Sequence, residues 1–210
     1  MFFERGALYM LLLTKSILSL MIGFIAAVIV GLILIPFLKR INFGQRISEY
    51  VGESHRKKEG TPTMGGIIFI IPTVLGIFYL VMSGKVEMTY NLGIVLLVFV
   101  LYAFLGFLDD FLSIKRGKNE GLTVSQKFIG QIIIALLFFA IYMKFNGDTS
   151  FVVTTLGINI ELGFVYGIFI LLFMVWFSNA VNLTDGLDGL AGGLSAIAFL
   201  AFGLISMGSW

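Results

Sequence analysis

The sequence contains no cysteine, one histidine, three prolines and few charged residues. Without cysteine the chain has no disulfides, no thiolate zinc ligands and no cysteine nucleophile, and His55 alone does not make a zinc site. Charged residues make up 12% of the chain, against about 25% in an average globular protein. Hydrophobic residues make up 59%, and the mean hydropathy is +1.03. This composition excludes a soluble domain and a disordered chain and indicates a polytopic membrane protein.

Six apolar runs have about the length that a helix needs to cross a hydrocarbon core of roughly 30 Å. Inside a bilayer each run must satisfy its own backbone hydrogen bonds, which favours helices. The sequence therefore predicts an all-α fold, a bundle of six transmembrane helices in one integral membrane domain over residues 1–210. The predicted spans are Ile17–Leu38, Met64–Met82, Tyr90–Leu108, Phe128–Met143, Leu162–Val181 and Leu190–Met207. The fourth is the shortest, and an earlier start at Gln126 is an alternative.

Lysine and arginine are unevenly divided between alternate loops. Ten of the 14 basic residues lie in the loops after the first and third spans. Because cytoplasmic loops are enriched in these residues, the two loops are predicted to be cytoplasmic and the N-terminus to be outside. The other four are Arg5, Lys15, Lys85 and Lys144.

The predicted external stretch 149–162 differs from the helical runs. Apolar residues at 158, 160 and 162 alternate with polar ones, which is the period of a β-strand. Leu156-Gly157 suits a turn, so a small external β-hairpin is predicted here.

Three polar clusters fall on the predicted cytoplasmic side. The first is Asp109-Asp110, at the end of the third span. Adjacent carboxylates repel each other and meet the negative end of the helix dipole. A Mg²⁺ ion, which takes oxygen ligands, would relieve both penalties. An acidic helix end solvated by water is the alternative.

The second cluster, Asn182-Leu-Thr-Asp-Gly-Leu-Asp-Gly189, lies between the fifth and sixth spans. Asp185 and Asp188 share a face if this segment is helical, and its glycines would let a phosphate approach the backbone. Thr184 and Asp185 are also good N-cap types. Capping leaves the second aspartate and Asn182 unexplained, so a functional site is favoured.

The third cluster, Lys57 to Gly66, combines basic residues, hydroxyls and glycines before the second span. This composition suits an anionic ligand at a helix start, although a topology-setting loop needs the lysines too. Together the three clusters predict metal-assisted chemistry on a phosphate, between a lipid in the membrane and a soluble cytoplasmic partner. No nucleic-acid partner is expected.

The strings Gly60-Thr-Pro-Thr-Met-Gly-Gly66, Asp109-Asp110 and Asn182-Leu-Thr-Asp-Gly-Leu-Asp-Gly-Leu-Ala191 resemble those of the phospho-N-acetylmuramoyl-pentapeptide transferases. That family belongs to the polyprenyl-phosphate N-acetylhexosamine-1-phosphate transferases. The resemblance implies transfer of phospho-N-acetylmuramoyl-pentapeptide from UDP-N-acetylmuramoyl-pentapeptide to undecaprenyl phosphate, giving lipid I and UMP with Mg²⁺. It also implies peptidoglycan synthesis at the cytoplasmic face of a bacterial plasma membrane, and hence a role in cell shape and division.

The same resemblance implies roles for the residues that match. Asp109 would activate the lipid phosphate, Asp110 would support it, and Asp185 would complete the catalytic set. Asp109 and Asp185 would be the metal ligands. The residues implied to bind substrate are Lys58, Thr63, Asn182, Asp188 and Lys127.

Two features depart from the family pattern. Ser113 and Ser125 stand where relatives often have lysines, for which Lys115 or Lys127 would compensate. The family also has further spans, with another metal-binding aspartate and a histidine-rich motif, so the chain is expected to be the N-terminal part of a longer enzyme and inactive alone. The oligomeric state is open, and a homodimer is one alternative.

Three rival functions are also compatible with these clusters. A GlcNAc-1-phosphate transferase would act on the same lipid with a different nucleotide sugar. A prenyltransferase would use the aspartates to hold a diphosphate and would release pyrophosphate. An ion-coupled transporter would carry its carboxylates near the bilayer midplane, along discontinuous helices.

Overall fold

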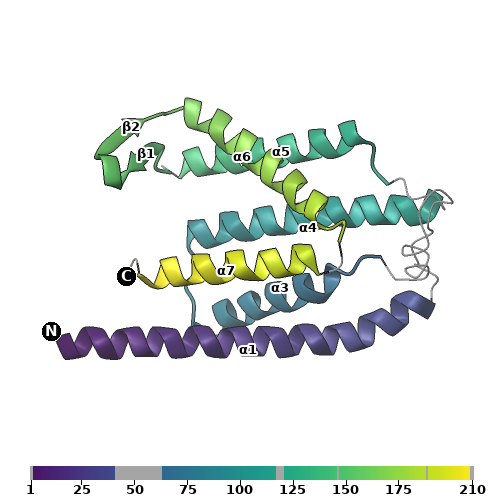
Figure 1. Cartoon of the computed structure of the whole chain (residues 1–210), viewed down its shortest axis with the longest axis horizontal. Helices are drawn as coiled ribbons and strands as arrows, with labels where there is room; N and C mark the ends of the chain where they lie inside the picture. The colour runs from purple at the N-terminus through teal and green to yellow at the C-terminus, as the bar shows by residue number, and fades with distance from the viewer. Residues whose placement is uncertain (1, 41–62, 117–120, 146, 188, 209–210) are drawn as a thin grey trace. The chain divides into compact units, whose positions relative to one another are not determined.

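The computed structural model describes residues 2–40, 63–116, 121–145, 147–187 and 189–208. Within them the chain forms six α-helices and one two-stranded sheet (Figure 1), as the sequence predicts. The helices are α1 (Phe2–Arg40), α3 (Ile67–Met82), α4 (Tyr90–Arg116), α5 (Val124–Lys144), α6 (Val165–Thr184) and α7 (Leu190–Gly208). The strands are β1 (Ser150–Val153) and β2 (Ile158–Glu161), joined by the short 3₁₀ helix η1 (Thr154–Leu156).

Each predicted span corresponds to one of these helices. Four of them are long and apolar enough to cross a membrane: α1 from Met10 onward, α4, α5 and α6. The apolar helices α3 and α7 are shorter. At a rise of about 1.5 Å per residue, the 16 residues of α3 extend for about 24 Å, somewhat less than the hydrocarbon core.

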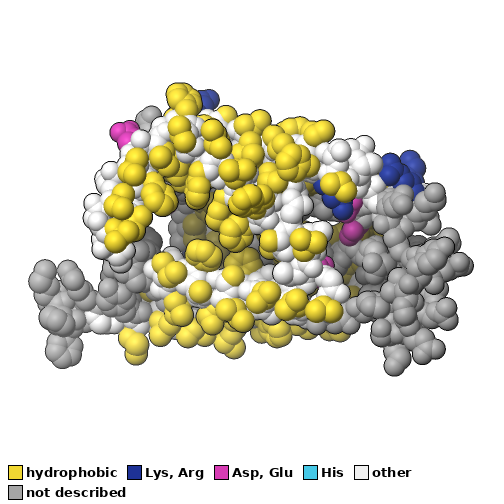
Figure 2. All heavy atoms as spheres, turned by 45° about the horizontal axis from the view of Figure 1, so that its top comes forward, with side chains coloured by type: hydrophobic (Ala, Val, Ile, Leu, Met, Phe, Trp, Pro, Cys, Tyr) yellow, Lys and Arg dark blue, Asp and Glu magenta, His cyan; other side chains and the backbone are white. Residues whose placement is uncertain are grey.

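Apolar side chains are exposed along every helix. Leu32 on α1 is 71% exposed and Phe199 on α7 is 77% exposed, and Figure 2 shows hydrophobic side chains spread over the surface of the described helices. A soluble monomer does not tolerate contiguous apolar surface of this kind. Among the described residues the buried hydrophobic ones are Leu38, Met64, Ile94, Ile134, Ala135 and Val175.

The chain folds as two compact units. One unit comprises Met1–Ala26 with Trp176–Trp210, and the other comprises Ala27–Val175. The larger unit holds α3, α4, α5 and the sheet, and the smaller unit holds α7 with parts of α1 and α6. A single domain across residues 1–210 stays a prediction.

Within the larger unit, α4 and α5 pack side by side in opposite directions (Figure 1). Gly130 on α5 permits this approach, because a Cβ there would lie only 2.7 Å from the Leu105 side chain of α4. Helix α4 also contacts α6, because the hydroxyl of Tyr102 on α4 donates to the carbonyl of Met174 on α6 at 3.4 Å. The packing brings the C-terminal end of α4 beside the N-terminal end of α5.

The predicted hairpin is confirmed. Strands β1 and β2 are antiparallel, with Ser150 opposite Glu161 and Val153 opposite Ile158. Gly157 has a φ of 63° at the turn, a left-handed conformation that glycine adopts at little cost. Two strands alone are marginally stable, and the two arms are joined at the base by the Leu162 N–H, which donates to the Thr149 carbonyl at 3.2 Å. The Ser150 N–H also donates locally to Asp148 Oδ1 at 2.8 Å.

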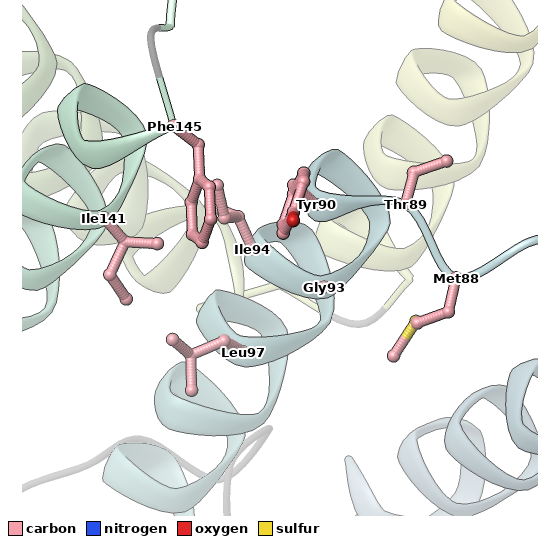
Figure 3. A pocket seen from close by; sticks show the side chains of 8 residues that line it. All are labelled: Met88, Thr89, Tyr90, Gly93, Ile94, Leu97, Ile141 and Phe145. Atoms are coloured by element: carbon pink, nitrogen blue, oxygen red, sulfur yellow. The ribbon is translucent and has the colours of Figure 1, made fainter.

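An apolar pocket of about 290 Å³ lies between the start of α4 and the end of α5 (Figure 3). The rings of Tyr90 and Phe145 stack there with centroids 4.1 Å apart. It lies at the end of α4 away from Asp109-Asp110, and its lining offers little to a phosphate. The lining residues are Met88, Thr89, Tyr90, Gly93, Ile94, Leu97, Ile141 and Phe145.

Candidate active site

The Asp109-Asp110 pair lies inside α4 rather than at its end. The helix continues to Arg116, with Lys115 and Arg116 in its last turn. Apolar residues after the pair extend the helix, and the two basic side chains suit the negative end of its dipole. The aspartates therefore do not lie at the negative end of the dipole of α4, where the sequence predicted them. The argument for an active site depends instead on what each carboxylate contacts.

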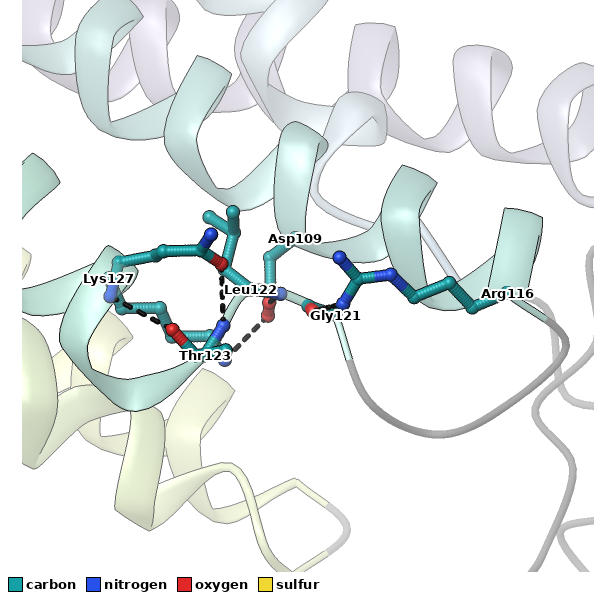
Figure 4. A network of polar contacts seen from close by, with 7 residues as sticks. Asp109, Arg116, Gly121, Leu122, Thr123 and Lys127 are labelled. Atoms are coloured by element: carbon teal, nitrogen blue, oxygen red, sulfur yellow. Dashed lines mark hydrogen bonds and ion pairs between the residues drawn. The ribbon is translucent and has the colours of Figure 1, made fainter.

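Asp109 is held by the start of the next helix (Figure 4). Its Oδ2 pairs with Lys127 Nζ at 2.7 Å, and its Oδ1 accepts the Leu122 N–H at 2.7 Å. The side chains of Lys127 and Asp109 are 35% and 26% exposed. A carboxylate oxygen has two lone pairs, so each oxygen keeps acceptor capacity for a further partner. The structure thus brings together two predicted site residues, Asp109 and Lys127.

The N-terminus of α5 is fixed by a capping box. The Gln126 N–H donates to Thr123 Oγ1 at 3.2 Å, and the Thr123 N–H donates to Gln126 Oε1 at 3.0 Å. This reciprocal pair satisfies two backbone groups that a helix start leaves open. It also explains why α5 begins at Val124, earlier than the predicted Phe128. Lys127 follows directly, so the cap sets where its ammonium group lies.

Gly121 and Arg116 complete the charged corner formed by Asp109, Leu122 and Lys127. The sequence did not predict this role for either residue. Arg116 Nη1 donates to the Gly121 carbonyl at 2.7 Å. A Cβ on Gly121 would overlap the carbonyl and the carboxylate of Asp109. Nothing in the sequence marks this glycine, whereas Thr123-Val-Ser-Gln126 is a recognisable cap pattern.

Asp110 faces a different segment. Its Oδ2 accepts the Met64 N–H at 2.9 Å, across 46 residues of sequence. Met64 is 7% exposed and has a φ of 65°, which is uncommon for a residue with a side chain. Next to it, Thr63 Oγ1 is buried and has no hydrogen-bond partner among the described residues. Two of the predicted clusters, the Asp pair and the segment before α3, therefore meet.

The second cluster, from Asn182 to Gly189, belongs to the smaller unit. Asn182 lies exposed in the last turn of α6, and Asp185 lies exposed in the turn that follows. Thr184 Oγ1 donates to the Val181 carbonyl at 2.7 Å and so does not cap α7. Residues 185–187 form turns and a bend rather than helix. An encounter of Asp185 with Asp109 stays a prediction, and Asp188 and Lys58 lie outside the described residues.

The donors present suit Mg²⁺ in their chemistry. Magnesium usually takes one or two carboxylates and completes its shell with water and substrate phosphates. Asp109 has free acceptor capacity on both oxygens, and Asp185 is exposed. Among the described residues no three acidic, histidine or cysteine side chains gather in one place, so the protein groups alone do not form a closed metal cage there.

The apolar helices and the paired aspartates define an integral membrane protein with a charged cluster where the last part of α4 meets the start of α5. The chain belongs to glycosyl transferase family 4, whose family model matches residues 91–209. It also carries signature 1 of the phospho-N-acetylmuramoyl-pentapeptide transferases, at residues 58–70. The matched signature includes Thr63 and Met64, and the family match includes both Asp109 and Asp185.

Curated relatives with the name phospho-N-acetylmuramoyl-pentapeptide-transferase are similar over most of this chain. The protein from Oceanobacillus iheyensis is 44% identical over 196 residues, which is 92% of this chain and 60% of the relative. The Bacillus subtilis protein is 44% identical over 189 residues, covering 90% and 58%. The Listeria monocytogenes protein is 43% identical over 201 residues, covering 95% and 60%. The chain thus spans about 60% of the length of these relatives.

Proposed function

We propose that this protein transfers phospho-N-acetylmuramoyl-pentapeptide from UDP-N-acetylmuramoyl-pentapeptide to undecaprenyl phosphate. The products are lipid I and UMP, and the pathway served is peptidoglycan synthesis. One observation carries the proposal: the signature segment donates the Met64 N–H to Asp110, next to the Asp109 carboxylate that pairs with Lys127. A segment typical of these transferases thereby lies against a corner suited to phosphate chemistry.

In the proposed reaction a phosphate oxygen of the lipid attacks the phosphorus attached to the sugar. The new P–O bond forms as the bond to UMP breaks, and UMP leaves as the anion. Phosphoryl transfer of this kind depends on positioning and on neutralising charge. Asp109, oriented by Leu122 and Lys127, lies against the lipid phosphate and activates it. The ammonium group of Lys127 then offsets negative charge on the phosphates.

Further roles follow for the other residues under this proposal. Mg²⁺ held by Asp109 and Asp185 would supply Lewis-acid stabilisation of the pyrophosphate charge. Asp110 supports the catalytic corner. Thr63 is assigned to substrate binding, which its buried hydroxyl without a partner in the described part of the chain supports. The remaining substrate contacts are assigned to Lys58, Asn182 and Asp188.

We also infer the setting of this reaction. The active site faces the cytoplasm of a bacterium, and the protein crosses the plasma membrane several times with its N-terminus outside. The effects on cell shape and division follow from peptidoglycan supply, and a homodimer is the oligomeric state to test. Because the matched relatives are longer than this chain, we expect the 210 residues alone to release no UMP from the nucleotide substrate.

The proposal is tested with protein purified from its native membrane and supplied with undecaprenyl phosphate. UDP-N-acetylmuramoyl-pentapeptide and UDP-GlcNAc are compared, and UMP and pyrophosphate are both measured. We expect UMP from the first nucleotide only, loss of UMP release on adding EDTA, and recovery with excess Mg²⁺. UMP from UDP-GlcNAc alone would instead support a GlcNAc-1-phosphate transferase. Pyrophosphate release from a prenyl diphosphate would support a prenyltransferase, and ion flux without any transfer would support a transporter.

A further inference from the structure

We propose that Arg116 and Gly121 are positioning residues for Asp109. This inference deepens the proposed function and rests on it. The two residues, with Leu122, form a clasp that holds the turn at residues 121–123, just before α5, against the Asp109 carboxylate (Figure 4). Neither residue contacts substrate under this proposal; both act by fixing where the Asp109 oxygens point.

The carboxylate of Asp109 has little choice of orientation while the clasp is closed. Its Oδ1 accepts the Leu122 N–H and its Oδ2 pairs with Lys127, both at 2.7 Å. One partner lies in the turn and the other on α5, so the carboxylate is held from two different segments. The remaining lone pairs therefore point in fixed directions, and a reacting phosphate meets a preorganised acceptor.

Gly121 makes this approach of the turn sterically possible. A Cβ at this position would overlap both the carbonyl and the carboxylate of Asp109. The overlap involves α4 backbone, which cannot move aside as a flexible side chain can. Any side chain larger than hydrogen would thus push Leu122 away from Asp109. Gly76 on α3 is a matched contrast, because nothing described lies within 4 Å of a Cβ built there.

Arg116 holds the same turn from the other side. Its Nη1 donates to the Gly121 carbonyl at 2.7 Å, which belongs to the same peptide group as the Leu122 N–H that binds Asp109. From the sequence alone, a basic residue in a predicted cytoplasmic loop is most simply interpreted as a phosphate-binding residue or as a determinant of membrane topology. The contact in the structure assigns its guanidinium to the backbone of the turn instead.

The first experiment compares Gly121→Ala with Gly76→Ala in protein from its native membrane. We expect Gly121→Ala to lower kcat for UMP release by up to about a hundredfold, because a misplacement of about 1 Å can cost that much. The KM for the nucleotide should change by less than about twofold, because the binding groups are not removed. Gly76→Ala should leave both constants unchanged. Equal kcat in the two variants would overturn the proposal.

The second experiment tests Arg116 and does not depend on a Gly121 variant folding. Arg116→Ala should lower kcat severalfold at constant KM, and Arg116→Lys, which keeps a donor and a charge, should recover part of the loss. Amide hydrogen exchange in residues 121–123 should speed up in Arg116→Ala, whatever reaction the protein catalyses. A raised KM at constant kcat would show that Arg116 binds the nucleotide directly, and unchanged exchange would show that there is no clasp. Absence of UMP release by the unmodified protein would contradict the proposed function. The exchange rates of residues 121–123 would still test whether Arg116 holds this turn.

Discussion

Asp109 and Asp110 are neighbours in sequence but serve different segments of the chain. Asp109 contacts the start of α5, and Asp110 contacts the backbone before α3. The sequence predicts that both matter, because two adjacent carboxylates need cations or donors. It does not predict that the two carboxylates bind different segments, because the donors that each one meets depend on how α3 and α5 pack against α4. Gly121 was missed for the same reason, since only the packed turn shows that a Cβ would collide with Asp109.

Lys127 provides a prediction at this scale. Its ion pair with Asp109 is about one-third exposed, so removing it should cost only about 0.2–1 kcal/mol of stability. Transfer depends on the charge more strongly, because the phosphates concentrate negative charge in the reaction. We expect Lys127→Ala to shift the thermal midpoint little and to lower kcat for UMP release at least about tenfold, with Lys127→Arg in between.

Lys115→Ala is the control for Lys127. Lys115 is exposed in the last turn of α4 and is the alternative lysine after the Asp pair. It should be close to neutral in both measurements. A large loss of transfer in Lys115→Ala with none in Lys127→Ala would reverse the assignment of the phosphate-binding lysine.

Among the elements, existence and order were predictable, while the ends were less so. Long apolar runs specify α1 and α4 to α6 strongly, since a bilayer leaves them little alternative to helix. The end of α4 was placed too early because the pair of aspartates interrupts the apolar run that marks a span. The start of α5 was placed too late, although Thr123 and Gln126 form a visible cap pattern.

Thr123→Ala tests the importance of this cap. The substitution removes the side-chain acceptor of the capping box, which should destabilise the protein by about 1 kcal/mol. For a chain of this size that corresponds to roughly 2–4 °C in the thermal midpoint. Ser125→Ala, an exposed hydroxyl in the first turn of the same helix, should shift it by much less. Equal shifts in the two variants would contradict a specific capping role.

The hairpin provides a test by pH. Hydrogen bonds from Ser150 lower the pKa of Asp148 below its usual value. A carboxyl with a lowered pKa stabilises the folded form above its unfolded pKa, and that contribution is lost as pH falls through the lowered folded value. The protection factor of the Ser150 amide should therefore fall on acidification below pH about 4. In Asp148→Asn the protection should not depend on pH in this range, and an equal fall in that variant would rule out Asp148 as the cause.

For the whole molecule, composition alone identified the class. A chain with 59% hydrophobic residues and 12% charged ones must place apolar side chains against lipid, and the structure exposes them along every helix. The prediction that the three polar clusters lie on one side of the membrane followed from counting spans, since loops after alternate helices share a side. That reasoning is supported where Met64 meets Asp110. It stays a prediction for Asn182 and Asp185, which lie in the other unit.

The measurement that tests the central claim most directly is UMP release by Asp109→Asn, purified from the native membrane beside the unmodified protein. Asparagine keeps the shape of the side chain but removes the charge that pairs with Lys127 and would bind Mg²⁺. Because such preorganised charges contribute about a hundredfold or more to a rate, we expect Mg²⁺-dependent release of UMP from UDP-N-acetylmuramoyl-pentapeptide to fall by at least that factor, with the protein still folded. Release at the unmodified rate by a folded Asp109→Asn protein would contradict a catalytic site at this corner.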